Sequence, residues 1–325
     1  MRRARLLLSG LLVSLALAAC GGSSPSSNDS IAPLTGLPAT GTSAERSRPA
    51  LFVKIENSPD ARPQTGIEQA DVVYEVVAEG GITRFAAVFQ STDPGQIGPV
   101  RSVRGQDPDL AAPLQGLAVF AGGIPDYVTQ IDAVAQDLST SSSLGEGPPY
   151  RRDTARRPPH NLFASAPGFW ALAKSPYDEA PKPLFTYGDL PAGTTPATSV
   201  AIDFSPAAAV SWAWDGQAWR RSQGGRPFTV TGSGRIGPAN LVVQFVDVRD
   251  SGQIDPAGHG VPVSTLVGSG DAQIFRNGQQ IAGTWSKSDR NARTTYATAG
   301  GDTINLTPGR TWVELVPRGQ SVKVS

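Results

Sequence analysis

Two apolar runs separated by paired glycines constrain the fold of this chain more than any other feature. Residues 72–78 (VVYEVVA) and 82–90 (ITRFAAVFQ) are rich in β-branched and aromatic residues, and Gly80 and Gly81 join them. Paired glycines can take the positive φ angles that a tight turn between strands requires. The pattern therefore predicts a β-hairpin, around which we expect the first half of the chain to be organised.

Charged residues are set into this predicted hairpin and follow it closely. Glu75 interrupts the first run, Glu79 stands at the turn, Arg84 comes shortly after it, and Arg101 and Arg104 follow in the run GPVRSVR. Charges in and beside an apolar sheet are costly to bury unless they are paired or bound to a ligand. The region is therefore either an internal ion-pair lattice or the floor of a binding site.

The N-terminus indicates where the protein resides. Residues 1–19 combine a basic start with an apolar run too short to span a bilayer comfortably, which predicts a signal peptide. The run ends in LAAC, which is typical of the lipoprotein box, where Cys20 becomes the acylated N-terminus; the alternative is an ordinary signal peptide with an incidental cysteine. We expect lipid attachment, such as palmitate, on Cys20 and a cell-membrane location facing the extracytoplasmic side.

Composition limits the classes of function. Cys20 is the only cysteine, so its acylation would leave no thiol for a disulfide, a metal or catalysis. The 28 basic and 28 acidic residues balance, and loss of the three arginines of residues 1–19 leaves a net charge of −3, which gives no electrostatic case for nucleic acid. We also expect no cofactor.

The predicted domain organisation follows from local composition. Residues 20–32 are rich in Gly, Ser and Pro and predict a flexible tether. Residues 33–190 predict a mixed α/β domain. Residues 191–325 carry short β-branched runs with Asp-Gly and Asn-Gly turns and no helical period, which predicts an antiparallel all-β domain, sandwich or barrel. The overall fold class is α+β.

A strand, a glycine pair and a helix follow one another in the first half. Residues 116–121 form the apolar run, Gly122 and Gly123 end it, and Pro125 suits the first turn of a helix. Such a junction can hold an anion on exposed backbone N–H groups, although a strand-to-helix turn often needs glycine for geometry alone.

The segment 150–161 (YRRDTARRPPHN) contains four arginines before His160 and Asn161. Histidine is the side chain best suited to proton transfer near neutral pH. A lone histidine in a loop is, however, more often a structural hydrogen-bonding group.

Aromatic residues in the second half allow two interpretations. Trp212 and Trp214 share a strand face by period two, and Trp219 follows the Asp-Gly turn. These rings could stack on carbohydrate, but a packed aromatic core is favoured. The second histidine, His259, lies in a glycine loop without acidic or cysteine residues at metal-ligand spacing.

The runs EGGITR, GPVRS and PHN occur together and in order, and GTWSKSDRNARTTY and LTPGRTWVELVP follow in the C-terminal part. With these motifs the chain resembles the YerB-like bacterial lipoproteins. The resemblance covers nearly all of the mature chain. It implies an envelope lipoprotein with two domains of unknown function, the first of mixed α/β type.

Three functions remain open. The sequence contains no Gly-x-Ser-x-Gly, His-Glu-x-x-His or phosphate-loop motif. The first hypothesis is binding of an anionic or polar envelope ligand, such as a cell-wall glycan or phosphate polymer, or of a protein partner. The residues expected to bind it are Arg62, Arg84, Arg101, Arg104, His160 and Asn161, with Gly122 and Gly123 as backbone donors and Glu75 and Glu79 orienting the arginines.

The second hypothesis is an envelope hydrolase that acts on a glycan or a phosphodiester. Glu56 or Glu79 would be the base and His160 the acid, while Arg84 and Arg101 would stabilise negative charge. The third hypothesis is purely structural, with every charge in an internal lattice and the function in protein–protein contacts.

Overall fold

The computed structural model describes residues 31–232, 234–255 and 258–325. The predicted signal peptide, the lipid attachment at Cys20 and the tether up to residue 30 lie outside the described residues. Within the described part, no helix is long and apolar enough to cross a membrane.

The predicted central hairpin is confirmed. Strands β2 (Val72–Val77) and β3 (Thr83–Phe89) pair antiparallel, with Val77 opposite Thr83. The turn between them is the 3₁₀ segment Glu79–Gly81, in which Gly80 and Gly81 have φ angles of 67° and 73°. The glycines thus supply the left-handed backbone conformation that the turn needs.

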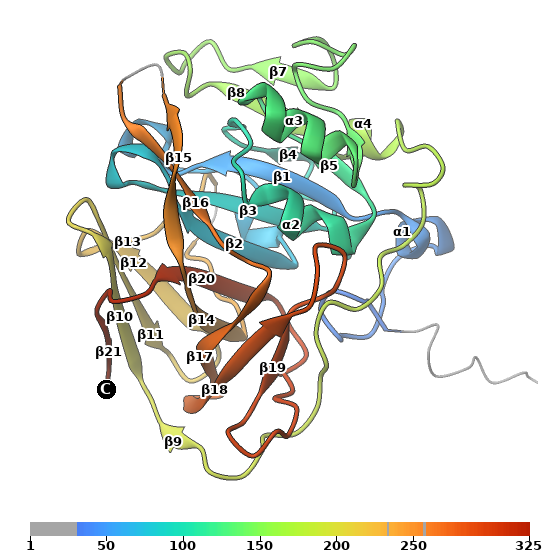
Figure 1. Ribbon diagram of the computed structural model, residues 1–325. Helices are drawn as coiled ribbons and strands as arrows, with labels where there is room; N and C mark the ends of the chain where they lie inside the picture. The colour runs from blue at the N-terminus through green and yellow to red at the C-terminus, as the bar shows by residue number, and fades with distance from the viewer. Residues whose placement is uncertain (1–30, 233, 256–257) are drawn as a thin grey trace, which may run out of the picture.

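Strands from both halves of the chain form one large sheet. The sheet has 11 strands, in the order β19-β18-β17-β14-β20-β2-β3-β1-β5-β6, with β9 also paired to β18 (Figure 1). The remaining members of the first half are β1 (Leu51–Glu56), β5 (Leu117–Val119) and β6 (Gln136–Asp137). Those of the second half are β9 (Thr195–Pro196), β14 (Asn240–Val246), β17 (Gly268–Arg276), β18 (Gln279–Lys287), β19 (Thr295–Ala297) and β20 (Thr311–Pro317).

The junction between the halves is a parallel pairing of β2 with β20, so neither strand leaves its backbone groups unpaired at an edge. The second half contains no helix among its described residues. A sandwich or barrel closed within that half is not confirmed, because its strands extend the sheet of the first half.

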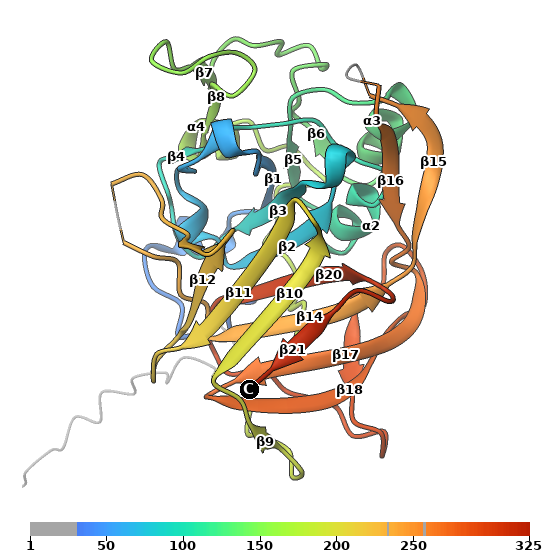
Figure 2. The same ribbon diagram turned by 90° about the vertical axis from the view of Figure 1, so that its left-hand side faces the viewer.

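A second, five-stranded sheet packs against one face of the first (Figure 2). Its strands are β13 (Arg226–Pro227), β12 (Trp219–Gln223), β11 (Ala208–Trp214), β10 (Ser199–Ser205) and β21 (Val322–Val324). Burial alternates along β10 and β11, as expected for a sheet with one face in a core.

Most of the regular secondary structure is β-strand, and the α-helices are few and short. They are α1 (Ser43–Ser47), α2 (Asp107–Ala111), α3 (Pro125–Asp132) and α4 (Ala166–Trp170). The predicted order of strand, glycine pair and helix is confirmed by β5 and α3. Two small sheets complete the fold: β4 (Gln96–Ile97) with β8 (Leu162–Ser165) and β7 (Tyr150–Arg152), and the ribbon of β15 (Val248–Ile254) with β16 (Gly260–Ser264).

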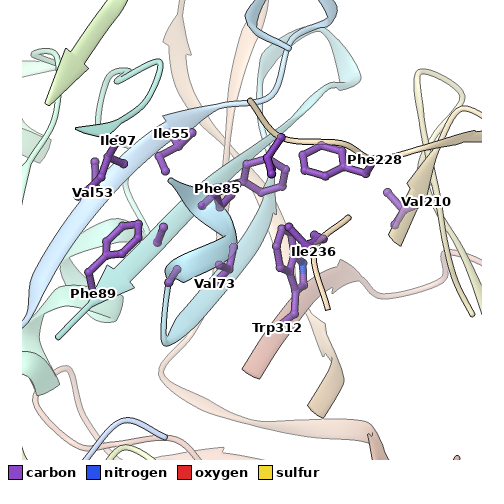
Figure 3. Close-up of a cluster of buried hydrophobic side chains, with 14 of the residues drawn as sticks. Val53, Ile55, Val73, Phe85, Phe89, Ile97, Val210, Phe228, Ile236 and Trp312 are labelled. Atoms are coloured by element: carbon purple, nitrogen blue, oxygen red, sulfur yellow. The ribbon is translucent and has the colours of Figure 1, made fainter. Parts of the chain in front are cut away.

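The large sheet separates two hydrophobic cores. The core between the two sheets contains Phe85, Phe228 and Trp312, with ring centroids 5.8 and 5.2 Å from Phe85 (Figure 3). Trp212 and Trp219 are buried in the same core, which supports the packed-core interpretation of the tryptophans. The other core includes side chains from β1, β5, α2, α3 and β16.

Candidate functional site

The charged residues of the central hairpin lie on both faces of the large sheet. Glu75 is opposite Phe85 in the register, whereas Arg84 is opposite Val76 on β2 and Glu56 on β1. Because side chains alternate along a strand, Glu75 faces the core between the two sheets and Arg84 faces the other core. The single charge set predicted from the sequence is therefore divided into clusters on opposite faces.

The Glu79 cluster consists of Glu79, Arg84 and Arg104. Arg104 donates from Nε and Nη2 to the two carboxylate oxygens of Glu79, the second bond measuring 2.8 Å, and Arg84 Nη2 lies 3.2 Å from Glu79 Oε2. The three side chains are at most 10% exposed. Burial, followed by the charge of Arg104, lowers the pKa of Arg84 to about 10.

Glu79 is held as an anion in this cluster. Although burial opposes ionisation, hydrogen bonding from Arg104 and the positive charges of Arg84 and Arg104 keep its pKa below the ordinary value. Both carboxylate oxygens are occupied, so Glu79 is not placed to act as a base. The hairpin turn contributes this carboxylate to an ion-pair lattice.

A second buried ion pair, between Lys54 and Asp107, lies next to the Glu79 cluster. Lys54 Nζ lies 2.7 Å from Asp107 Oδ1, both side chains are fully buried, and Asp107 Oδ2 accepts a bond from the Arg104 N–H. Burial lowers the pKa of Lys54. The sequence analysis did not select this pair; a lysine inside the apolar run LFVKI was the available signal.

The Glu56 cluster lies at the outer end of the same face and consists of Glu56, Ser58, Arg101 and His160. His160 Nδ1 is 3.0 Å from Glu56 Oε2, Arg101 Nε is 3.3 Å from Glu56 Oε1, and Ser58 donates to Oε1 at 2.9 Å. Glu56 is 2% exposed, whereas the side chains of Arg101 and His160 are 24% and 20% exposed. Arg101 and His160 thus connect the buried lattice to solvent.

The glycine pair contributes packing next to this cluster. Gly122 has φ 63° and its carbonyl accepts from the Val103 N–H at 3.0 Å. A Cβ on Gly123 would lie 2.6 Å from Val103 Cγ1 and 3.3 Å from its carbonyl oxygen. The positive φ angle accounts for Gly122 and the close approach of Val103 accounts for Gly123, while the preceding Ala121 N–H donates to the Arg101 carbonyl.

Two other predicted binding residues lie apart from these clusters. Asn161 is buried and accepts from Arg152 Nη1 at 2.6 Å, while its own amide donates to the carbonyl of Asp153 at 3.3 Å. Arg62 donates to the side chain and the carbonyl of Asn57 at 3.2 and 2.8 Å. In the described part of the chain, neither side chain hydrogen-bonds to a side chain of the Glu56 or the Glu79 cluster, although Asn161 directly follows His160.

The Glu75 cluster occupies the opposite face and consists of Glu75, Arg221 and Glu314. Arg221 donates from Nη2 and Nε to the two oxygens of Glu75 at 2.6 and 3.2 Å, and all three side chains are fully buried. Glu75 and Glu314 are directly opposite each other on β2 and β20. Burial, together with the neighbouring charge of Glu75, raises the pKa of Glu314 well above its ordinary value, which favours the protonated form of Glu314 beside the Glu75–Arg221 pair.

Arg221 and Glu314 were missed by the sequence analysis. Arg221 reaches Glu75 from 146 residues away in the chain, and no local pattern indicates such a pairing. The signal that was present is an acid in the middle of an apolar strand, which occurs both in VVYEVV and in TWVELVP.

The described residues contain no group of three or more His, Cys, Asp or Glu side chains that could hold a metal ion. The charged side chains of this face are therefore paired with one another, and the Glu56 cluster is the part that reaches solvent. There Arg101, His160 and Ser58 surround the buried carboxylate of Glu56.

Comparisons with known proteins agree with the resemblance carried by EGGITR, GPVRS and PHN. Residues 34–177 match the model described as protein of unknown function (DUF3048) N-terminal domain, and residues 200–313 match the corresponding C-terminal domain. The chain is 29% identical over 302 residues to the Bacillus subtilis (strain 168) protein named "Putative lipoprotein YerB", covering 90% of this chain and 88% of that protein.

The fold is also similar to a solved structure. The crystal structure of YerB protein from Bacillus subtilis superposes with a TM-score of 0.75 and 27% identity, covering 90% of this chain and 99% of that one. The chain therefore belongs to the family whose two parts are described as the N-terminal and C-terminal DUF3048 domains.

Proposed function

We propose that this chain is a lipid-anchored, extracytoplasmic envelope protein that binds an anionic or polar envelope component through the outer end of the Glu56 cluster. Its similarity to a lipoprotein supports attachment to the membrane. In this proposal Cys20 carries the acyl chains after removal of residues 1–19, and more than one chain gives stable anchoring.

The observation that carries the proposal is the state of Arg101. Its ion pair with Glu56 uses Nε, and within the described part of the chain its terminal nitrogens have no hydrogen-bond partner. The planar fork of an arginine binds a carboxylate or phosphate through two parallel bonds. Arg101 is therefore a partly exposed guanidinium, with Nε beside Glu56 and its terminal nitrogens available to donate.

The charge balance on this face favours an anionic ligand. The clusters contain four cations, Lys54, Arg84, Arg101 and Arg104, and three carboxylates, Glu56, Glu79 and Asp107. Each carboxylate already contacts a cation; Glu56 pairs with Arg101 and Asp107 with Lys54, so the excess positive charge belongs to the Glu79 cluster, where two arginines share one carboxylate. Phosphate-bearing polymers and acidic cell-wall glycans supply the complementary charge, and an acidic protein surface would do so in the same way.

One observation favours a hydrolase as second candidate. Glu56 holds His160 Nδ1 at 3.0 Å, which leaves Nε2 directed away from the carboxylate, with Asp60 at 4.0 Å. A carboxylate that orients a histidine in this way is one half of a general-base arrangement. Ser58 lies 3.4 Å from Nδ1 and not at Nε2, so it is not placed as an activated nucleophile.

A thermal-shift titration of the intact lipoprotein in detergent tests the binding proposal. The probes are glycerol phosphate oligomers and soluble cell-wall glycan fragments. A ligand at about 100 times its Kd stabilises the native state by about 2.7 kcal/mol, which corresponds to about 5 °C for a chain of this size. Arg101→Ala should abolish the shift.

The matched control is Arg249→Ala, an exposed arginine on β15, which should retain the shift. Absence of a shift with every probe, or an equal shift in Arg101→Ala, contradicts the proposal. Release of product from a glycan or a chromogenic phosphodiester, lost in His160→Gln, would instead support the hydrolase.

A further inference from the structure

A cavity of about 350 Å³ lies where the two halves of the chain meet, and no member of the Glu56 cluster lines it. Its walls come from the loop after β1 and from the β12–β13 hairpin with the segment that follows. These two parts are joined by a bridge between Gln64 and Val230 and by a 2.8 Å bond from the Thr231 N–H to the Gln64 carbonyl. The lining contains Arg62 and Arg226 but no aspartate or glutamate.

The amide of Gln223 is fixed by its oxygen, which leaves the N–H₂ group of a residue that lines this cavity available as a donor. Gln223 Oε1 accepts from Arg221 Nη1 at 2.9 Å and from Asn57 Nδ2 at 3.1 Å. An arginine can only donate, so the atom that it meets must be the oxygen. Gln223 is 8% exposed and lines the cavity, and within the described residues its Nε2 has no hydrogen-bond partner.

The two arginines add further unpaired donors. Arg62 is held at Asn57 through Nε and Nη2, which leaves Nη1 without a partner in the described part of the chain. Arg226 is exposed and makes no ion pair with any described residue. The nearest buried carboxylate, Glu75, is already paired with Arg221, and the two act on Arg62 with opposite sign.

The remaining walls are apolar except for Thr229. Pro59, Pro63 and Pro227 line the cavity together with Phe228, which is 3% exposed. Proline and phenylalanine rings in a cavity wall contact the hydrocarbon part of a ligand, while the polar groups at one end of the cavity fix the orientation of the ligand. A volume of about 350 Å³ is at the lower end of the range for ligand sites, which suits a group about the size of an amino acid or a glycerol phosphate.

We propose that this cavity is a second binding site, which takes a small ligand carrying an oxyanion, carboxylate or phosphate, on a compact apolar stem. Gln223, Arg62 and Arg226 donate to the oxyanion, and the proline and phenylalanine rings contact the stem. The site shares no residue with the Glu56 cluster, so an experiment can support or contradict this proposal independently of the function proposed above.

Isothermal titration of the intact protein in detergent tests this site with three small probes. N-acetylalanine supplies a carboxylate, glycerol 3-phosphate supplies a phosphate, and N-acetylalanine amide is the neutral match of the first. We expect binding of at least one anion and none of the amide. The anion that binds identifies the source of the oxyanion as a peptide-type acid or a phosphate ester.

Variants locate the binding. Arg226→Ala removes an exposed side chain and should weaken binding about tenfold or more, the effect of losing a charge-assisted bond. Arg249→Ala should bind as the wild type, and so should Arg101→Ala, which separates this site from the Glu56 cluster.

Gln223→Glu provides a second test. It keeps an oxygen for Arg221 and replaces the donor at the cavity with an acceptor, so it should abolish anion binding. Equal binding of the amide, wild-type affinity in both Arg226→Ala and Gln223→Glu, or no binding of either anion up to about 10 mM would overturn the proposal.

Discussion

The Glu75 cluster gives a sharp prediction because its two acids, although adjacent, have different partners. Glu75 pairs with Arg221, whereas Glu314 accepts a bond from Trp212 at 2.6 Å and has a raised pKa, caused by burial and by the charge of Glu75, that favours its protonated form. Glutamine is a close match for a protonated glutamate and a poor one for an ionised glutamate. Replacing each acid by glutamine should therefore have unequal effects.

The magnitudes follow from the contacts. Glu314→Gln retains an oxygen for Trp212 and a donor toward Glu75, so it should cost less than about 1 kcal/mol. Glu75→Gln removes the charged partner of Arg221 and should cost about 1.5–3 kcal/mol, since Glu314 can then ionise in its place. The double variant leaves Arg221 as an unpaired buried charge and should cost about 3–5 kcal/mol, more than the sum of the single changes.

Guanidinium unfolding at pH 7, followed by circular dichroism, measures these differences, and equal m values confirm that the same surface is exposed. Equal costs for the two single variants would refute the reasoning, because they would mean that Glu314 is ionised in the folded protein.

The pH dependence of the free energy of unfolding gives an independent test of the raised pKa of Glu314. A group whose pKa is raised on folding binds its proton more tightly in the native state, so its contribution to stability is complete below the unfolded pKa and is lost as pH rises toward the folded pKa. For Glu314 the loss begins near the ordinary value of 4.5 and amounts to about 1.4 kcal/mol per pH unit. Glu314→Gln should remove this contribution to the slope.

Other parts of the lattice yield three further predictions. Glu79 has a lowered pKa, so its contribution is present above pH 4.5 and lost as pH falls; Glu79→Gln should reduce stability at pH 7 and flatten the acid side of the stability profile. Lys54→Ala leaves Asp107 buried and unpaired and should lower the free energy of unfolding by about 3–5 kcal/mol in the same assay. Gly123→Ala should cost about 1–3 kcal/mol by overpacking, whereas Gly147→Ala, whose Cβ would meet only one atom at 3.6 Å, should be nearly neutral.

Each of these has a contrary outcome. An unchanged acid profile in Glu79→Gln would mean that the carboxylate is not held by Arg104. A small loss in Lys54→Ala would mean that water reaches Asp107, and equal melting temperatures for the two alanine variants would remove the close-approach explanation of Gly123.

Local pattern was sufficient for some elements of the fold. The hairpin of β2 and β3 follows from its apolar runs and glycine turn, and α3 follows from the glycine pair and from Pro125 in its first turn. Those signals depend only on neighbours in sequence. The insertion of β20 between β14 and β2 depends on pairing between distant segments, which no local propensity encodes.

The candidate site shows the same limit. The sequence predicted charges that need partners, and Arg84, Arg101 and Arg104 do lie with Glu56 and Glu79. It did not separate them from Glu75, because the face on which a side chain lies depends on strand register. The partners supplied by other segments, such as Arg221, required the tertiary structure.

The central claim is that Arg101 is the open end of an otherwise closed lattice. Side-chain Nε–H NMR of the ¹⁵N-arginine-labelled protein tests it directly during titration with glycerol phosphate oligomers. The Arg101 signal should shift with added ligand, while those of Arg84 and Arg104, which are held by Glu79, stay in place. A titration in which the Arg101 signal does not move, or in which all three move together as the lattice opens, would contradict the account.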